Sequence, residues 1–151
     1  MPLNNFEKFL GTGFYTGYIP FAPGTFGSAA ALLIYLIPGF ENLYIIIPAI
    51  ILFTLIGIPI GTKFESVYGK DPSQCTIDEV IGMWISLLFL PKIWWVIVVT
   101  FIVWRIMDIV KPFPANFMER LSGGRGIIFD DIVAALYTSA LMHLFLFFIN
   151  K

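Results

Sequence analysis

Charged residues are scarce in this chain of 151 residues, because they make up 13% of it against about 25% in an average soluble domain. Hydrophobic residues account for 58% instead. Nine Lys and Arg oppose ten Asp and Glu, so the chain lacks the positive field that nucleic-acid binding requires. The composition therefore predicts a small integral membrane protein, with no nucleic-acid partner and no evident obligate protein partner.

Cysteine and histidine each occur once, as Cys75 and His143. A single cysteine excludes an internal disulfide and a multi-cysteine metal site. A single histidine excludes zinc sites built from several histidines, and His143 lies inside an apolar segment where a phosphohistidine is not expected. Cys75 has no neighbouring histidine to activate it. The sequence therefore offers no evident covalent nucleophile.

Repeats of fixed period and low-complexity tracts are absent, which predicts a single domain over residues 1–151. Within it, charged residues lie almost entirely between five apolar segments, namely Ser28–Ile37, Leu43–Gly61, Val80–Leu90, Ile93–Met107 and Ile132–Ile149. Only the second and the last approach the ~20 residues that a full membrane span needs. The other three also suit re-entrant or interfacial helices.

Two turn signals, Pro38-Gly39 and Pro91-Lys92, would close helical hairpins and return their ends to one side. A third turn, flexible and rich in glycine, is expected at 123–126. Most basic residues then share that side, namely Lys8, Lys63, Lys70, Arg105, Lys111, Arg120 and Arg125, while Lys92 and Lys151 remain opposite. The positive-inside rule makes the first side cytoplasmic. The predicted fold is an all-α, multi-pass membrane protein of about five helical segments, some short or re-entrant, with a polar site at the cytoplasmic edge.

Two acidic pairs, Asp78-Glu79 and Asp130-Asp131, directly precede apolar segments. One interpretation is helix capping, because carboxylates accept hydrogen bonds from free N–H groups at a helix start. The other is a site for a hard divalent cation such as Mg²⁺, which prefers carboxylate oxygens and offsets clustered negative charge. One acid of each pair could cap while the other turns inward, so both interpretations stay open.

The stretch RIMDIVKP places Arg105, Asp108 and Lys111 at successive i,i+3 spacings, so they share one broad helix face. They are either a helix end with an ion pair and snorkelling cations, or a functional group. In the functional interpretation the two cations bind an oxyanion, and Asp108 binds metal or orients water. Pro112 should stop the helix just beyond.

The stretch PFAPGTFGS precedes an apolar segment and carries small hydroxyl residues, Thr25 and Ser28. With the backbone N–H groups of a helix start they could receive a phosphate, or they could simply form a capped entry turn. The lysine of a nucleotide-binding P-loop is missing, so a nucleotide triphosphatase is not supported.

These stretches, GTGFYTGYIPFAPGTFGS, DEVIGMW, RIMDIVKPFP and GIIFDDIVAAL, in this order and spacing, resemble the phosphatidylglycerophosphatase A family. The resemblance runs from about Gly11 to Leu136. It implies a helical enzyme that removes the terminal phosphate of phosphatidylglycerophosphate with Mg²⁺ at the bacterial cytoplasmic membrane. The family's motif residues fall on Pro23, Gly24, Thr25, Gly27, Ser28, Asp78, Glu79, Gly82, Arg105, Asp108, Lys111, Pro112, Asp130 and Asp131.

Within that set we expect Glu79, Asp108 and Asp131 to be catalytic and to surround the metal. Asp78 and Asp130 either join them or support them, while Arg105, Lys111, Thr25 and Ser28 bind the substrate phosphate. The alternative from another class is a transporter or ion-channel subunit that uses the acids as a cation site. It predicts charges distributed in depth through the membrane, whereas here they gather at one predicted edge.

Overall fold

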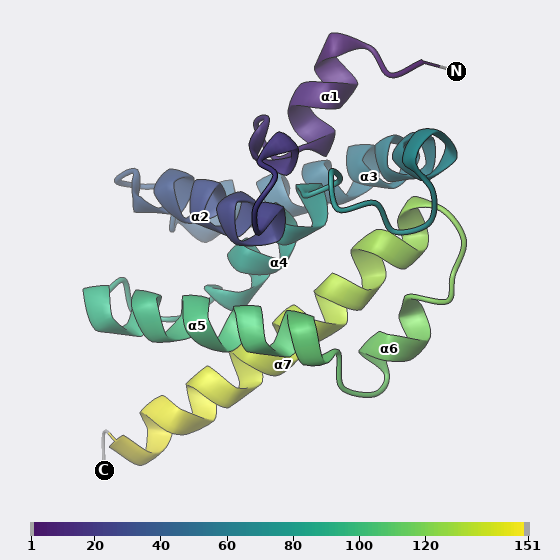
Figure 1. Cartoon of the computed structure of the whole chain (residues 1–151). Coiled ribbons are helices and arrows are strands. Elements are labelled where there is room, and N and C mark those ends of the chain that lie inside the picture. The colour runs from purple at the N-terminus through teal and green to yellow at the C-terminus, as the bar shows by residue number, and fades with distance from the viewer. Residues whose placement is uncertain (1, 150–151) are drawn as a thin grey trace.

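The computed structural model describes residues 2–149, and over that range the chain is helical with no strand (Figure 1). The seven α-helices are α1 Asn5–Gly11, α2 Pro23–Leu36, α3 Leu43–Tyr68, α4 Ile77–Ser86, α5 Trp94–Val110, α6 Ala115–Met118 and α7 Gly124–Ile149. A short 3₁₀ turn, Thr16–Tyr18, lies between α1 and α2. The predicted all-helical class is confirmed.

Two of these helices are long and apolar enough to cross a membrane. α3 and α7 have 26 residues each, and α3 continues through Pro48 and Pro59. The other predicted apolar segments overlap the shorter helices α2, α4 and α5. The number of passes and the side on which the polar residues lie stay predictions, and Lys151 lies outside the described residues.

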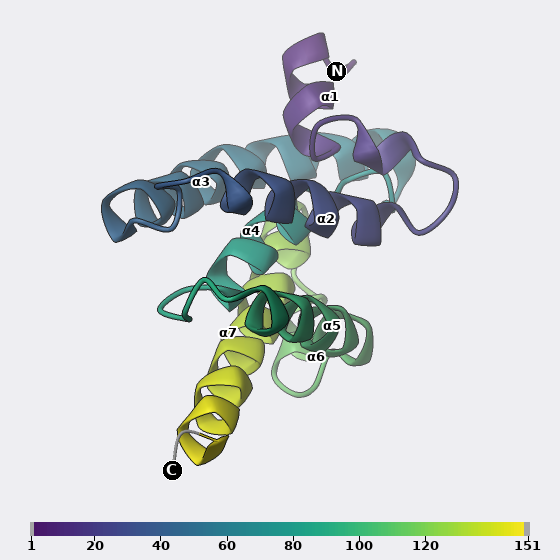
Figure 2. The same ribbon diagram turned by 90° about the vertical axis from the view of Figure 1, so that its left-hand side faces the viewer.

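Helix α4 is the centre of the fold. All ten of its residues, Ile77 to Ser86, are buried. In Figure 2, α2 and α3 lie on one side of α4, and α5 and most of α7 lie on the other. Because α4 is enclosed in this way, the acids of its first turn are drawn into the interior.

A close approach between α4 and α5 depends on Gly82. A Cβ added there would lie 2.2 Å from the ring of Trp104, so only glycine admits this indole. On the α2 side of α4, the indole N–H of Trp84 donates to the carbonyl of Ala31 at 3.0 Å. These contacts fix α2 and α5 around α4.

The outer faces of the long helices are apolar. Leu55 of α3, Ile109 of α5 and Phe148 of α7 are exposed by 64, 73 and 64%. Soluble monomers rarely expose such continuous apolar surface. The exposed faces, like the two long apolar helices, fit a membrane protein.

Both predicted hairpin turns fall between helices, since Pro38-Gly39 follows α2 and Pro91-Lys92 precedes α5. The predicted helix stop is also confirmed. α5 ends at Val110, Lys111 adopts a left-handed conformation with φ of 44°, and Pro112 follows. The turn at Lys111 directs the chain into α6.

Candidate active site

A cavity of about 730 Å³ lies where α2, α4, α5, α6 and α7 meet. Its wall contains Thr25 from the start of α2, Asp78 and Glu79 from α4, Arg105 and Asp108 from α5, and Asp131 from α7, with Lys111 beyond α5. Sequence positions more than a hundred residues apart are therefore brought to one place. Seven of the nine residues expected at the site line this cavity.

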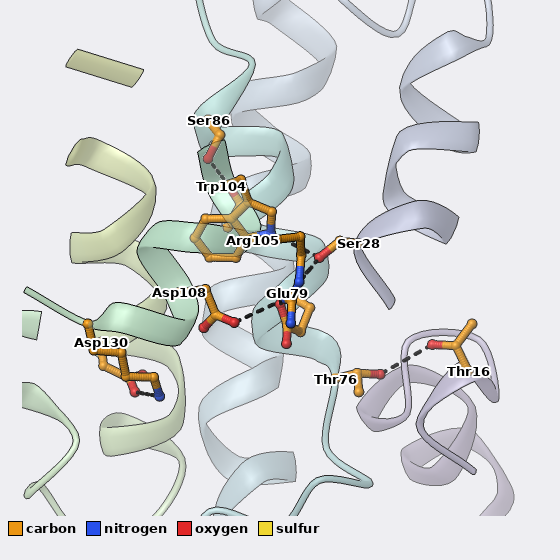
Figure 3. Close-up of polar contacts among 11 residues, drawn as sticks. Thr16, Ser28, Thr76, Glu79, Ser86, Trp104, Arg105, Asp108 and Asp130 are labelled. Atoms are coloured by element: carbon orange, nitrogen blue, oxygen red, sulfur yellow. Dashed lines mark hydrogen bonds and ion pairs between the residues drawn. The ribbon is translucent and has the colours of Figure 1, made fainter. Parts of the chain in front are cut away.

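Glu79 is the centre of a polar network (Figure 3). Its Oε2 forms an ion pair with Arg105 Nη1 and accepts a hydrogen bond from Ser28 Oγ at 3.2 Å. Arg105 Nη1 also lies 3.1 Å from Asp108 Oδ2. The guanidinium thus bridges an acid of α4 and an acid of its own helix.

Three buried carboxylates converge at the cavity. Glu79, Asp108 and Asp131 each offer an oxygen, and these oxygens lie within 4.8 Å of one another. Oδ2 of Asp131 and Oδ1 of the neighbouring Asp78 are buried without a hydrogen-bond partner. Converging carboxylates from three different helices, with unpartnered oxygens on Asp78 and Asp131, form the kind of donor set that a hard divalent cation takes.

Positive charge at the site does not balance the acids. Arg105 forms ion pairs with Glu79 and Asp108, while Lys111 Nζ pairs with Asp130 Oδ2 at 2.5 Å. These two cations therefore stand against five carboxylates, with Asp78 and Asp131 forming no ion pair within residues 2–149. A bound divalent cation would supply the missing charge.

The pKa values of the two α4 acids, Asp78 and Glu79, are raised at this site. Burial raises the pKa of Glu79 to about 7, with the charge of Asp108 adding to the effect and Arg105 opposing it. Burial also raises the pKa of Asp78 well above its usual range, and the charge of Glu79 adds to it. Without further positive charge these acids resist ionisation, so the donor set fits a cation such as Mg²⁺.

Lys111 is held charged by its surroundings. Burial lowers the pKa of Lys111, but the charges of Asp130 and Asp131 outweigh it and keep the pKa above the ordinary value. Asp130 is 1% exposed and does not line the cavity. Its contacts make it the counter-ion of Lys111.

The capping interpretation of Asp130-Asp131 is wrong. Helix α7 begins at Gly124, so both acids lie in its second turn, past the free N–H groups. The hydroxyl of Thr62 caps the helix instead, accepting from the N–H of Gly124 at 2.9 Å. At α4 the N-cap position belongs to Thr76, and the Glu79 carboxylate binds Arg105 and Ser28.

The first residues of α2 also lie against the Glu79 carboxylate. Thr25 lines the cavity, whereas Ser28 is fully buried behind Glu79 and does not line it. A Cβ added at Gly24 would lie 2.0 Å from Glu79 Oε1, so glycine is needed for this approach. The contacts of Ser28 orient Glu79, and phosphate binding by Ser28 stays a prediction.

The cavity is also lined by polar residues that were not expected from the sequence, Asp71, Asn116 and Glu119 among them. Asp71 comes from the loop before α4, and Asn116 and Glu119 come from α6 and its end. They belong to none of the four sequence motifs, and only the folded loops bring them to the wall. Cys75 also lines the cavity, but burial raises the pKa of its thiol, which therefore stays protonated and weakly nucleophilic.

Comparison with known proteins gives a family match. A model of the family "Phosphatidylglycerophosphatase A" matches residues 9–146. Over 141 residues the chain is 40% identical to a "Putative phosphatidylinositol-3-phosphatase" of Bacteroides thetaiotaomicron, covering 88% of this chain and 89% of the relative. It is 32% identical over 146 residues to the phosphatidylglycerophosphatase A of Escherichia coli, and the match covers 95% of this chain and 85% of the relative. It is 34% identical over 132 residues to the phosphatidylglycerophosphatase A of Haemophilus influenzae, and the match covers 85% of this chain and 81% of the relative. No solved structure matches significantly.

Proposed function

This chain belongs to the phosphatidylglycerophosphatase A family, and we propose that it hydrolyses phosphatidylglycerophosphate to phosphatidylglycerol and inorganic phosphate with the help of Mg²⁺. Its place would be a bacterial cytoplasmic membrane, with several passes and the cavity facing the cytoplasm. The observation that carries the proposal is the buried convergence of Glu79, Asp108 and Asp131 beside Arg105 in one cavity.

The residues that would hold the metal are Glu79, Asp108 and Asp131, with Asp78 beside them. When bound, Mg²⁺ would neutralise phosphate oxygens, activate water and stabilise the departing alkoxide. Support comes from the donor set, which consists of carboxylates only, and from the excess of acids over cations.

The chain's own cations would receive the phosphate. Arg105 has a buried Nε without a hydrogen-bond partner, and this N–H is free to donate to a phosphate oxygen. Lys111 and Thr25 both line the cavity. Together they would supply positive charge and donors where negative charge develops in phosphoryl transfer.

Hydrolysis would proceed by direct attack of water on phosphorus. The water oxygen forms a new bond to phosphorus, the bond to the glycerol oxygen breaks, and that oxygen takes up a proton from solvent water. A carboxylate of the cluster accepts the proton of the attacking water, for which Asp108 is our assignment. The protonated thiol of Cys75 is no alternative nucleophile.

Phosphate release from phosphatidylglycerophosphate by the purified protein tests the proposal, with Mg²⁺ and with a chelator. We expect release that the chelator abolishes, and a loss of at least about a hundredfold in Glu79→Gln, Asp108→Asn and Asp131→Asn. Glu41→Gln is the matched control, because Glu41 pairs with Lys92 away from this cavity. Absence of release under Mg²⁺, or near-normal turnover in all three variants, would overturn the proposal.

A second substrate deserves the same assay. The relative from Bacteroides thetaiotaomicron is named for a phosphatase that acts on a phosphorylated phosphatidylinositol, and it shares 40% identity with this chain. Both lipids carry a phosphomonoester on a glycerolipid headgroup. The ratio of kcat/KM for the two lipids decides between them.

Membership of a phosphatase family argues against the transporter alternative.

A further inference from the structure

One outer face of α5 leads into the cavity. Val98, Ile102, Ile106 and Ile109 are exposed by 48, 52, 49 and 73%. Their spacings of four, four and three residues place them in one stripe along the helix. Ile109 also lines the cavity, as does its neighbour Val110. The α5 stripe, defined by these four residues, is therefore continuous with the polar site.

The exposed apolar faces of α3 and α7 do not reach the site. Leu52 and Leu55 of α3 are exposed by 55 and 64%, but no residue of α3 lines the cavity. From α7 the cavity wall receives the buried Asp131 and none of the exposed Leu or Phe side chains. Among the three longest helices within residues 2–149, which are α3, α5 and α7, α5 is the one whose exposed face of large apolar side chains ends at the cavity.

The end of α5 presents two kinds of surface. Arg105 and Asp108 point toward Glu79 and the cavity (Figure 3). Ile106 and Ile109, which directly follow them in the sequence, lie on the exposed face. A molecule with a phosphate at one end and a hydrocarbon chain at the other would match both surfaces at once.

The length of the stripe also suits a hydrocarbon chain. From Val98 to Ile109 the helix rises by roughly 16 Å, at 1.5 Å per residue. One leaflet of a bilayer is about 15 Å deep, half of the ~30 Å hydrocarbon core. An acyl chain lying along the stripe would thus contact α5 over roughly the length that one leaflet provides.

We propose that the α5 stripe binds an acyl chain of a phospholipid whose terminal phosphomonoester occupies the cavity. This inference rests on the proposed function, because it takes the substrate to be a lipid phosphate. It makes Ile106 and Ile109 determinants of the preference for long-chain lipids over short, soluble ones.

Kinetics on two chain lengths test the stripe. For Ile106→Ser combined with Ile109→Ser, we expect KM for long-chain phosphatidylglycerophosphate to rise about tenfold, and KM for a dibutanoyl analogue to change by less than about twofold. The control pairs Leu52→Ser with Leu55→Ser, which are similarly exposed on α3. Equal effects on both substrates, no effect on either, or the same effect in the control pair would overturn the inference.

A binding assay separates the inference from the proposed chemistry. The probe is phosphatidic acid with a photoreactive group on its acyl chain, and phosphatidylcholine with the same chain lacks the phosphomonoester. We expect the phosphatidic acid probe to label 98–109 more than 51–55, and the phosphatidylcholine probe to show no such preference. Equal labelling of both helices by the phosphatidic acid probe would overturn the stripe. Preferential labelling without phosphate release would retain the stripe and overturn the proposed function.

Discussion

The indole N–H of Trp104 donates a hydrogen bond to the hydroxyl of Ser28 at 2.9 Å, and both side chains are fully buried. Ser28 in turn donates to Glu79 Oε2 at 3.2 Å. A hydroxyl has one proton, so accepting from Trp104 leaves that proton for the carboxylate. A tryptophan on α5 thereby orients a candidate metal-binding acid on α4 through a serine on α2.

Replacing Trp104 by Phe should uncouple this relay. Phenylalanine lacks the indole atoms that lie against Gly82, so a small cavity forms there, and Ser28 loses its donor, so that its hydroxyl can turn away from Glu79. We expect kcat/KM to fall about tenfold and the Mg²⁺ concentration for half-maximal activity to rise, with about 2 kcal/mol lost in stability from the hydrogen bond and the cavity together. Trp84→Phe is the matched control, because Trp84 is also buried and donates to the Ala31 carbonyl. Equal losses of activity in both variants would contradict the relay.

Adding a methyl group at Gly24 should displace Glu79. The new Cβ would lie 2.0 Å from Oε1 of a carboxylate that Arg105 and Ser28 hold in place. We expect Gly24→Ala to lose most activity while the thermal unfolding midpoint changes by only a few degrees. In Gly57→Ala the added Cβ meets the side-chain end of Ile128 instead, so activity should persist. Normal turnover by Gly24→Ala would show that the close approach has no catalytic consequence.

Removing Lys111 should destabilise the fold through Asp130. This carboxylate is 1% exposed and its partner in an ion pair is Lys111 at 2.5 Å. An uncompensated buried charge costs about 3–5 kcal/mol, so Lys111→Met should lower the free energy of unfolding by roughly that amount. Adding Asp130→Asn should recover most of the loss. The measurement is unfolding in detergent for both single variants and the double variant; additive effects would argue against the pair.

Neutralising Asp78 should stabilise the protein in the presence of a chelator. Its Oδ1 is buried without a partner, and the acids around the cavity outnumber the cations. Burial keeps the pKa of Asp78 raised, so without metal the folded chain must bind a proton that the unfolded chain releases at neutral pH. Asp78→Asn removes that cost, so the unfolding midpoint should rise while phosphate release falls. A lower midpoint under chelator would contradict this reading of the charge balance.

Mg²⁺ should itself stabilise the folded chain. A ligand that binds the native state alone raises the free energy of unfolding by an amount that grows with its concentration. We expect the unfolding midpoint of the wild type to rise with Mg²⁺ and that of Asp131→Asn to respond much less. Na⁺ at equal ionic strength is the control, since general screening would act on both proteins alike.

Helix positions and turns were largely predictable from local pattern. The apolar runs, Pro38-Gly39, Pro91-Lys92 and the stop at Pro112 carry their information within a few residues. The start of α7 was not predictable in this way, because the glycine-rich run 123–126 was expected to be a flexible turn. A Cβ at Gly124 would lie 2.1 Å from the Ile58 carbonyl, so glycine allows the helix to begin against α3, where Thr62 caps it.

The sequence by itself determined that the chain is helical and that its acids and cations gather in four motifs beside apolar segments. Tertiary structure decided their partners. It paired Asp130 with Lys111, set Ser28 behind Glu79, and left Asp78 and Asp131 with unpartnered oxygens. The physical reason is the burial of α4 among four other helices. The neighbours of a side chain in that interior are set by helix packing, and one-dimensional spacing does not contain them.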